Sequence, residues 1–466
     1  MAIKRYTANA DNTITNAFEA NLQTRGTGSN MGQSDILETF SIYGQASTSS
    51  VEQSRILINF PVSEIYNDRE AGVIPASGSV SFYLRVHNAP HGQTLPKDYD
   101  LTILPISRSW QEGYGLDMEG YTDAGTSNWI SSSQGQAWTT PGGDYVTTPA
   151  YDQRINNGTE DIEVDISEMV EQWLEGTLDG NGLGIQLSSS YVALERSFYT
   201  KKFFARGSEY AYLRPKIEAR WDSTIKDRRN SFYASSSLVP ASDNLNTLYI
   251  YNKVRGQLQN IPAVGTGELS MSLYYGESTG PVGAVLATAT AGWVSTGIYS
   301  SSIAIDTTSS YLYDVWHDGA GTEYVTGSQI SVRSFTTDTG VDTGEYVSNI
   351  TNMKDKYTTS EKPRMRMFIR DKDWNPTIYT VATTNIETKV IEDAYFKVFR
   401  VADDFEVIPY GTGSLNYTRM SYDKDGNYFD IDMSLFEKGY SYGIKVAYKS
   451  NDIYNEQPEL FKFRVE

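Results

Sequence analysis

The chain has 466 residues, enough for about three domains at roughly 150 residues per domain. With 39 Lys and Arg against 58 Asp and Glu, its formal net charge of −19 disfavours nucleic acid, whose phosphate backbone is also anionic, as a partner. The absence of cysteine excludes thiolate metal sites, cysteine nucleophiles and disulfides, and the three histidines, His87, His91 and His317, leave little material for a histidine-rich metal cluster or a Ser-His-Asp triad.

Aromatic residues are abundant, with 34 Tyr, 17 Phe and 8 Trp beside 38 Gly. Aromatic and β-branched side chains suit a half-buried pleated surface, and Gly, Ser, Asn and Asp form turns between short strands. We therefore predict an all-β chain. The amino-terminal residues lack the apolar run of a signal peptide, and no window approaches the ~20 apolar residues of a membrane span, so we expect assembly in the cytosol and no membrane partner.

Residues 1–222 are predicted to form a first domain, a jelly-roll sandwich with long polar connections. Short apolar or alternating runs predict its strands at residues 54–60, 80–86, 99–105, 182–187 and 216–221. Residues 107–148 form an excursion rich in Gly, Ser and Trp, of a length that compact domains normally keep for a functional or partner-contacting role. We expect its tryptophans to anchor it to the sheet. His87 and His91, beside a strand end, are interpreted as turn residues.

One short helix is predicted against this β background. Five apolar residues recur at helical spacing: Ile166, Met169, Val170, Trp173 and Leu174. Asp165 is in position to cap the first turn, and Gly176 lies where a left-handed residue ends a helix. We expect this helix to cover one end of the sandwich.

Two further β domains are predicted, each preceded by a linker. Charged and small polar residues indicate a linker at 223–240, followed by a small β-sandwich at 241–345. Its expected strands are 247–251, 269–275 and 311–316. A polar stretch indicates a second linker at 346–362, followed at 363–466 by a sandwich of immunoglobulin or fibronectin type. Its expected strands are 364–369, 394–400, 442–448 and 460–465.

One acidic segment resembles a calcium loop. Asp423, Asp425, Asn427 and Asp430 place oxygen ligands at near-alternate positions, as a loop that wraps Ca²⁺ does. Gly426 comes too early for an EF-hand, and no glutamate closes the loop. The preferred interpretation is a hairpin turn built on Asp-Gly. No cofactor is therefore predicted, and calcium remains the alternative.

Five aromatic residues of the excursion are candidates for a contact surface: Trp110, Tyr114, Tyr121, Trp129 and Trp138. Exposed aromatic rings can stack on sugars, which would make this segment a glycan platform. The preferred interpretation is that these residues fill a core or a subunit contact, because Tyr and Trp also anchor protein interfaces.

The sequence offers no recognisable catalytic motif. It lacks the P-loop, Gly-x-Ser-x-Gly, dinucleotide-binding and His-Glu-x-x-His patterns. A glycosidase pair cannot be chosen among 58 acidic residues without the separation of roughly 5 to 9.5 Å that defines it. We predict that the chain is not an enzyme, and a glycan-degrading activity ranks last among the hypotheses.

The first domain resembles the DNRLRE-type jelly-roll family. The resemblance lies in residues 54–60, 107–110, 164–173, 182–185 and 213–217 and covers nearly half of the chain. Members of that family occur in extracellular and carbohydrate-binding proteins, so the resemblance implies a jelly roll and a possible host glycan as ligand.

The last domain is similar to fibronectin type III and related sandwiches over residues 435–446. The similarity is to the tyrosine corner, in which a Tyr hydroxyl bonds to upstream backbone. Tyr442 is expected to be that residue.

The combined layout resembles virion structural proteins of T4-like marine myophages. The similar segments are 4–8, 11–17, 24–28 and 440–445. The resemblance implies a non-enzymatic structural component of a tailed-phage virion, at the neck or collar, the tail or the capsid surface, assembled in the host cytoplasm. Its partners would be other virion proteins and further copies of itself. A carbohydrate-binding host adhesin that uses the first domain is the alternative.

Overall fold

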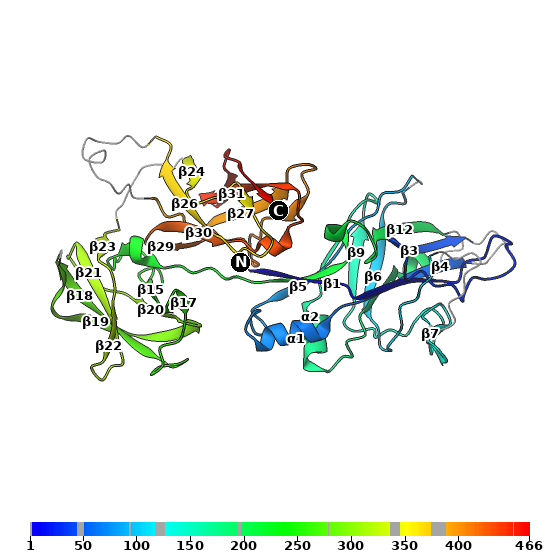
Figure 1. The fold of residues 1–466 in the computed structure, drawn as a ribbon, viewed down its shortest axis with the longest axis horizontal. Helices are drawn as coiled ribbons and strands as arrows, with labels where there is room; N and C mark the ends of the chain where they lie inside the picture. Colours follow the sequence, from blue (N-terminus) through cyan, green and yellow to red (C-terminus); the bar gives the residue numbers. More distant parts are fainter. Residues whose placement is uncertain are drawn as a thin grey trace. The chain divides into compact units, whose positions relative to one another are not determined.

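The computed structural model describes residues 2–43, 51–92, 95–116, 126–192, 197–277, 279–335, 345–373, 388–450 and 452–466. These residues form an all-β chain with a few short helices, as predicted (Figure 1). The chain divides into two compact units, the N-terminal unit of residues 2–222 and the C-terminal unit of residues 223–466. Among the described residues, no helix is both long and apolar enough to cross a membrane.

The N-terminal unit is a sandwich of two antiparallel sheets. One has the order β1-β13-β5-β10, and the other has the order β12-β3-β4-β11-β6-β9, with β2 also paired to β4. Their strands are β1 (Ile3–Thr7), β2 (Ala10–Thr15), β3 (Ile36–Tyr43), β4 (Val51–Asn59), β5 (Ser81–Val86), β6 (Tyr99–Pro105), β9 (Tyr151–Ile155), β10 (Ile162–Asp165), β11 (Leu183–Leu187), β12 (Phe198–Phe204) and β13 (Lys216–Arg220). A separate hairpin of β7 (Ser131–Ser133) and β8 (Gln136–Ala137) lies in the excursion.

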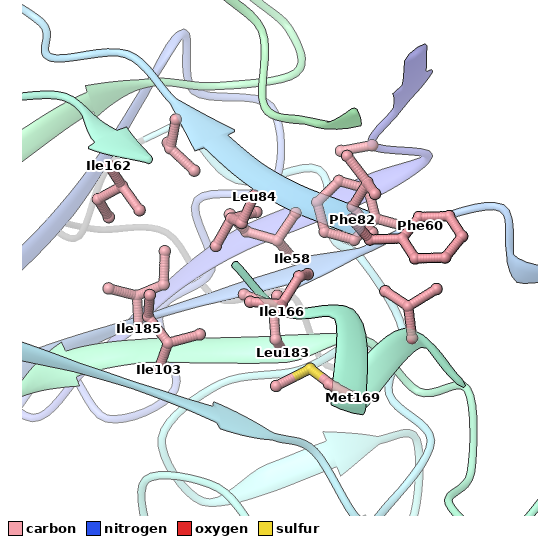
Figure 2. Close-up of a cluster of buried hydrophobic side chains, with 14 of the residues drawn as sticks. Ile58, Phe60, Phe82, Leu84, Ile103, Ile162, Ile166, Met169, Leu183 and Ile185 are labelled. Atoms are coloured by element: carbon pink, nitrogen blue, oxygen red, sulfur yellow. The ribbon is translucent and has the colours of Figure 1, made fainter. Parts of the chain in front are cut away.

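The core of this unit lies between the two sheets (Figure 2). Because strand side chains alternate between faces, β5 contributes every second residue from one sheet, and β4, β6 and β11 do so from the other. The labelled core residues are Ile58, Phe60, Phe82, Leu84, Ile103, Ile162, Ile166, Met169, Leu183 and Ile185, and all are buried. Burying each such side chain contributes about 1.5–3 kcal/mol, so this packing holds the two sheets face to face.

The predicted helix is present as α2 (Ser167–Glu175) and contributes Met169 and Trp173 to the core. It ends at Gly176 in the left-handed conformation, as predicted, with φ +73°. The predicted cap needs correction. The N-cap residue is Ile166, and Asp165 accepts the Ser167 backbone N–H at 2.9 Å from one position further upstream.

Within the described residues of the N-terminal unit, three other short helices were not predicted: α1 (Val62–Glu70), α3 (Ser189–Val192) and the 3₁₀ helix η1 (Ala211–Leu213). α1 packs beside α2, and Ile65 is its buried residue. Arg69 of α1 donates two hydrogen bonds to the Glu171 carboxylate of α2, at 2.5 and 2.6 Å. This bidentate pair fixes the two helices to each other at one end of the sandwich.

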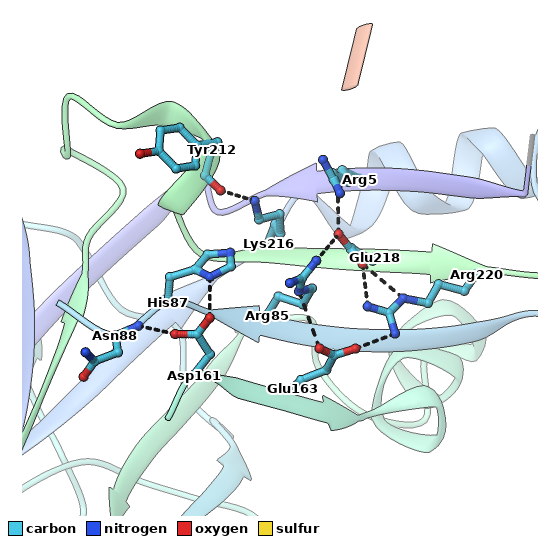
Figure 3. A network of polar contacts seen from close by, with 10 residues as sticks. All are labelled: Arg5, Arg85, His87, Asn88, Asp161, Glu163, Tyr212, Lys216, Glu218 and Arg220. Carbon is cyan, nitrogen blue, oxygen red and sulfur yellow. Dashed lines mark hydrogen bonds and ion pairs between the residues drawn. The ribbon is translucent and has the colours of Figure 1, made fainter. Parts of the chain in front are cut away.

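The face of the four-stranded sheet that points away from the core carries a charged network (Figure 3). At its centre the buried Glu218 carboxylate accepts hydrogen bonds from Arg5 at 2.8 Å, Arg85 at 3.2 Å and Arg220 at 2.6 Å. Burial alone would raise the pKa of Glu218, but the guanidinium groups outweigh burial and hold it well below its ordinary value. The network is therefore an ion cluster with Glu218 in its charged form.

The interpretation of His87 as a simple turn residue also needs correction. His87 follows β5, but its side chain is buried, with Nδ1 2.8 Å from an Asp161 carboxylate oxygen (Figure 3). The other oxygen of Asp161 accepts the Asn88 backbone N–H at 2.8 Å. Burial lowers the pKa of His87, although Asp161 partly opposes this effect.

The C-terminal unit begins with one curled sheet, which we call the middle module. Its order is β14-β23-β21-β18-β19-β20-β15, and β22 also pairs with β21. Its strands are β14 (Phe232–Tyr233), β15 (Asn246–Tyr251), β18 (Leu269–Glu277), β19 (Gly280–Ser295), β20 (Ile298–Ile303), β21 (Tyr311–His317), β22 (Glu323–Thr326) and β23 (Ile330–Arg333), beside a hairpin of β16 (Lys253–Val254) and β17 (Gln257–Leu258). The first and last strands meet through the buried Asn246 amide, which bonds the Tyr233 backbone N–H and C=O at 2.9 and 2.8 Å.

The rest of the C-terminal unit is a sandwich, which we call the terminal sandwich. Its sheets have the orders β24-β26-β30-β29 and β25-β33-β31-β27-β28, and β32 pairs with β31. Its elements are β24 (Tyr346–Ile350), β25 (Lys356–Tyr357), β26 (Arg364–Asp371), β27 (Ala394–Arg400), β28 (Glu406–Ile408), β29 (Ser421–Asp423), β30 (Gly426–Asp430), the 3₁₀ helix η3 (Met433–Leu435), β31 (Ser441–Ser450), β32 (Ile453–Glu456) and β33 (Phe461–Val465). Phe396 and Phe429 stack across its core, with ring centroids 4.3 Å apart.

The tyrosine corner predicted for this sandwich is confirmed. The Tyr442 hydroxyl donates to the Glu437 carbonyl at 3.0 Å and accepts the Glu437 backbone N–H at 2.9 Å. The ring itself is buried against Phe436 and Phe463. One side chain therefore holds the chain in place just before β31.

The two stretches expected to be linkers contain regular structure. Within 223–240, the 3₁₀ helix η2 (Arg228–Asn230) packs on β15, and β14 pairs in parallel with β23. Within 346–362, β24 pairs with β26, and β25 pairs with β33. The polar composition of these segments predicted linkers. Instead, strands far away in the sequence pair with them and hold them in regular structure.

Candidate functional site

The N-terminal unit has a wide groove beside the 107–148 excursion, with a volume of about 1020 Å³. Arg55 of β4 and Leu104 of β6 line it, together with the excursion and the loop before β11. Its polar lining includes Arg108, Thr139, Asp144, Tyr145, Asp179 and Asn181. Open grooves with a few convergent polar groups are where proteins commonly bind small polar ligands.

The tryptophans of the excursion anchor it to the sandwich, as expected. Trp129 and Trp138 are buried, and the Trp138 indole donates to the Asn128 carbonyl at 2.8 Å. Trp110 is half-buried and donates to the Asn181 carbonyl at 2.9 Å. Since protein covers the rings of Trp129 and Trp138, these two residues do not form an exposed stacking platform for sugars.

Of the two tyrosines proposed with them, the structure describes one. Tyr114 is 73% exposed, so its ring faces solvent. Tyr121 lies outside the described residues. Of the five aromatic candidates, Tyr114 and the half-buried Trp110 are therefore the described residues with accessible ring surface.

Asp144 is the best-defined polar group of the groove. Its carboxylate accepts the Thr139 and Thr140 backbone N–H groups at 2.9 and 3.0 Å and the Arg108 Nε–H at 2.9 Å. Burial raises the pKa of Asp144, but these donors outweigh it and keep the pKa below its ordinary value. Asp144 is thus a fixed negative charge at neutral pH.

A fixed positive charge lies close by. The Arg55 guanidinium is 5.2 Å from the Trp129 ring centroid and 5.5 Å from that of Tyr145, and it donates to the Gly142 carbonyl at 2.9 Å. The Tyr145 ring lies directly on Gly184 of β11, where a Cβ would come within 2.3 Å of the ring. Glycine at position 184 is therefore what allows the aromatic ring to cover this strand.

Sequence reasoning identified the excursion but missed the polar residues of the groove. Arg55, the adjacent Asp144 and Tyr145, and Asn181 come from three segments far apart in the chain, so no local pattern connects the three. The one local signal was the pair Gly142-Gly143, both with positive φ, which turns the chain just before Asp144.

The calcium candidates lie on the hairpin of β29 and β30. Asp423 pairs with Gly426 across a turn at Lys424 and Asp425, and Gly426 has φ +101°. This confirms the preferred interpretation as an Asp-Gly hairpin. The Asp423 carboxylate accepts two hydrogen bonds from Arg366, at 2.6 and 2.8 Å.

The other three candidates point to separate partners, and an Asp425 carboxylate oxygen lies 3.9 Å from the Lys424 Nζ. Asp430 accepts two hydrogen bonds from Arg364, at 2.8 and 3.1 Å. The buried Asn427 amide bonds the Ile391 backbone N–H and C=O, each at 2.8 Å. The four proposed ligands do not converge, and within the described ranges no three His, Asp or Glu side chains are placed to share a metal ion.

A second hollow, of about 390 Å³, lies in the C-terminal unit beside this hairpin. The charges beneath it are paired with each other. Arg229 donates to both oxygens of the fully buried Asp314, at 2.5 and 2.7 Å, and the Trp316 indole donates to Asp314 at 2.7 Å. Burial raises the pKa of the adjacent Asp227 to about 7, even though Arg229 partly opposes this effect.

No protein-family model matches the chain, and no curated protein matches it. Among solved structures, a DUF4785 family protein from Legionella pneumophila subsp. pneumophila str. Philadelphia 1 aligns with 99% of this chain and 90% of its own, at 6% sequence identity. The TM-score of that alignment is 0.14, which is too low for any conclusion about fold or function.

Proposed function

We propose that the chain is a non-enzymatic structural component of a tailed-phage virion, acting as a clamp or spacer at the neck or collar, the tail or the capsid surface. The observation that carries the proposal is the way the middle module and the terminal sandwich are joined through main-chain hydrogen bonds and an ion pair. A part that transmits load between neighbours in a particle needs such stiff connections.

Backbone pairing makes the first part of this connection. Asp227 donates its backbone N–H to the Tyr422 carbonyl at 3.0 Å, and Tyr422 donates its own to the Ile225 carbonyl at 3.0 Å. The chain leading into the middle module thus extends the sheet edge at β29 of the terminal sandwich. Main-chain bonding of this kind leaves little freedom for the two modules to rotate against each other.

Charge pairing makes the second part. η2 follows directly, and its Arg228 forms an ion pair with Glu392 of the terminal sandwich, with an N–O distance of 3.4 Å. A partly exposed pair of this kind contributes about 0–1 kcal/mol, so the main-chain hydrogen bonds make most of the connection. The acidic side chains here serve structure, which agrees with a protein that does not turn over a substrate.

The resemblance to virion structural proteins of T4-like marine myophages supplies the setting. In that setting the chain assembles in the host cytoplasm and contacts other virion proteins and copies of itself. Proteins that assemble from identical copies most often form closed, symmetric oligomers.

The proposal is tested on purified virions of the phage that encodes the chain. Mass spectrometry of washed particles should detect it at a fixed copy number, and antibody labelling in negative-stain images should mark one position on every particle. Absence from washed virions would rule the proposal out. Release of reducing ends from envelope polysaccharide by the purified chain would rule out its non-enzymatic part.

A second candidate function is glycan binding by the N-terminal unit, favoured by the groove itself. Arg108, Asp144 and Asn181 offer the charged and amide groups that bind sugar hydroxyls, and Trp110 lies beside them. A glycan array should then show binding by the wild type that Arg108→Ala and Asn181→Ala weaken. Glu70→Ala, on the exposed side of α1, is the matched control. No binding by the wild type removes this candidate.

A further inference from the structure

Lys201 of β12 is buried inside the N-terminal unit, where it is 1% exposed. Lysine is almost never fully buried unless its charge is paired. The Lys201 Nζ instead donates to two uncharged oxygens, the Asn88 Oδ1 at 2.6 Å and the Gly158 carbonyl at 2.8 Å. The amine of a buried lysine thus lies directly against the side-chain amide of an asparagine.

Burial also makes this amine more reactive than that of a surface lysine. It lowers the pKa of Lys201 to about 8 from its ordinary 10.5, although the charges of Glu160 and Asp161 partly oppose this effect. More of the side chain is therefore present as the uncharged amine at neutral pH. That is the form in which a desolvated lysine acts as a nucleophile.

The Asn88 amide is held in place next to the amine. Asn88 forms an antiparallel bridge with Phe203 of β12, and its backbone N–H donates to Asp161 at 2.8 Å. A C=O bond is about 1.2 Å long, so the Lys201 Nζ lies no further than about 3.8 Å from the Asn88 Cγ. Reacting atoms need to approach to about 3–3.5 Å, and a rotation of the amide completes the approach.

We propose that Lys201 and Asn88 react with each other in the folded chain and form an intramolecular isopeptide bond. The Lys201 Nζ attacks the Asn88 Cγ, the bond between Cγ and Nδ2 breaks, and the amide nitrogen leaves. A lysine ammonium and a primary amide thereby become a secondary amide and one ammonium ion. Atoms and charge balance, so the step needs no oxidant, reductant or cofactor.

The reaction requires a group that moves a proton from Nζ to the leaving nitrogen, and we assign this role to Glu160. Its Oε1 accepts the Asn156 and Asn157 backbone N–H groups at 3.0 and 2.6 Å, which fixes the carboxylate. Its Oε2 is buried and has no hydrogen-bond partner within the described part of the chain. The charge of Glu160 also acts on Lys201 more strongly than that of Asp161 does.

The bond would join the two sheets of the sandwich. Lys201 belongs to β12 of one sheet, whereas Asn88 follows β5 of the other, and the two residues are 113 positions apart in the sequence. The chain contains no cysteine, so this cross-link would do what a disulfide does, without depending on redox conditions. It would form whether or not the chain is part of a virion.

The mass of the purified full chain under denaturing conditions tests the proposal. We expect the wild type to be lighter than its sequence by one molecule of ammonia. Lys201→Arg and Asn88→Ala should each have the full mass of their sequence. Lys202→Arg is the matched control, because the Lys202 Nζ lies 3.5 Å from a Glu38 carboxylate oxygen, and this variant should lose ammonia as the wild type does.

Glu160→Gln tests the proton transfer separately. The substitution keeps an oxygen acceptor for the two backbone N–H groups but removes the carboxylate that takes up the proton. General acid–base groups typically contribute 10²–10⁴-fold, so we expect the loss of ammonia to be slower by about 100-fold or more. The circular dichroism spectrum should stay unchanged. A Glu160→Gln chain that loses ammonia at the wild-type rate would refute the role of Glu160.

A tryptic digest of the wild type locates the bond without any variant. Trypsin does not cleave after a lysine whose amine is acylated. The expected product is therefore one branched peptide in which residues 86–97 are joined to residues 197–202. Tandem mass spectrometry should place the branch between Asn88 and Lys201.

A wild type with the full mass of its sequence would overturn the proposal. So would a loss of ammonia that persists in Lys201→Arg, because it would come from another reaction, such as cyclisation at Asn157-Gly158. Separate linear peptides containing Asn88 and Lys201, with no branched product, would overturn it as well. The proposed function fails independently, when the chain is absent from virions whether or not it is cross-linked.

Discussion

The Tyr442 hydroxyl is the hydrogen-bond partner of both the N–H and the C=O of the Glu437 backbone. The stability of the terminal sandwich should therefore depend on this hydroxyl. Tyr442→Phe keeps the buried ring but leaves both backbone groups without that partner. An unsatisfied buried polar group costs about 1–3 kcal/mol, so we expect a loss of that size in the free energy of unfolding of the terminal sandwich. Urea unfolding measures it, with Tyr275→Phe at an exposed ring as the control. An equal effect of the two variants would contradict the prediction.

Asp227 gives the C-terminal unit a pH dependence. Burial raises its folded-state pKa to about 7 from the ordinary 3.8, so between these values the folded state binds a proton that the unfolded state releases. The contribution of Asp227 to the free energy of unfolding therefore decreases as the pH rises from 4 to 7. Above pH 7 the buried carboxylate is ionised in the folded state, and its destabilising effect is complete.

Asp227→Asn removes that cost while keeping an acceptor for the Arg229 backbone N–H. We expect the variant to raise the melting temperature by several degrees more at pH 8 than at pH 5, compared with the wild type at each pH. Asp243→Asn on the exposed surface should change the melting temperature equally at both pH values. Thermal unfolding followed by circular dichroism makes the comparison, and a pH-independent effect of Asp227→Asn would refute the assignment.

At the scale of elements, Asn246 acts as a substitute for backbone pairing between β14 and β15. Its buried amide satisfies both backbone groups of Tyr233 and so holds together the two ends of the curled sheet. Asn246→Ala removes the partner of both groups at once. We expect a loss of about 1–3 kcal/mol and faster amide hydrogen exchange in β14 and β15 than elsewhere in the sheet. Asn349→Ala, an exposed strand position, should change neither quantity.

Strands with a clear apolar pattern could be predicted from the sequence, and β19 could not. In β26, β27 and β31, apolar residues recur at every second position and lie on the buried face of the strand. An alternation with a period of two is the sequence pattern that predicts such a strand. β19 instead is rich in Gly, Ala, Thr and Val and has little buried surface, so its sequence shows no alternating pattern and the strand depends on its pairing with β18. α1 was missed for a similar reason, because Ile65 is its one buried residue.

The candidate groove could be predicted only in part. The Trp-rich composition drew attention to the excursion, since large aromatic residues in a long loop need something to pack against. The burial of Trp129 depends on Arg55, Gly142 and Tyr145, which reach it only in the folded chain. The same limit applies to the acidic hairpin, where Arg366 takes up the Asp423 carboxylate that the spacing had suggested for calcium.

At the scale of the whole molecule, the division at residue 222 predicts which fragments fold. Residues 1–222 and 223–466 should each unfold cooperatively as separate proteins. A fragment that starts at residue 241 loses Arg229 and leaves the buried Asp314 without its cation, which costs about 3–5 kcal/mol. Calorimetry of the three fragments checks this, and equal stability of fragments 223–466 and 241–466 would contradict it.

The pairing of β1 with β13 has a consequence for how the chain is made. β13 lies between β1 and β5, and the Arg5 and Glu218 side chains that meet there are 213 residues apart in the sequence. Until the ribosome has synthesised β13, the edges of β1 and β5 that pair with it stay unpaired, and their apolar face stays uncovered. The N-terminal unit can close only after β13 has emerged, so prematurely terminated chains should be degraded by proteases or held by chaperones until they are cleared.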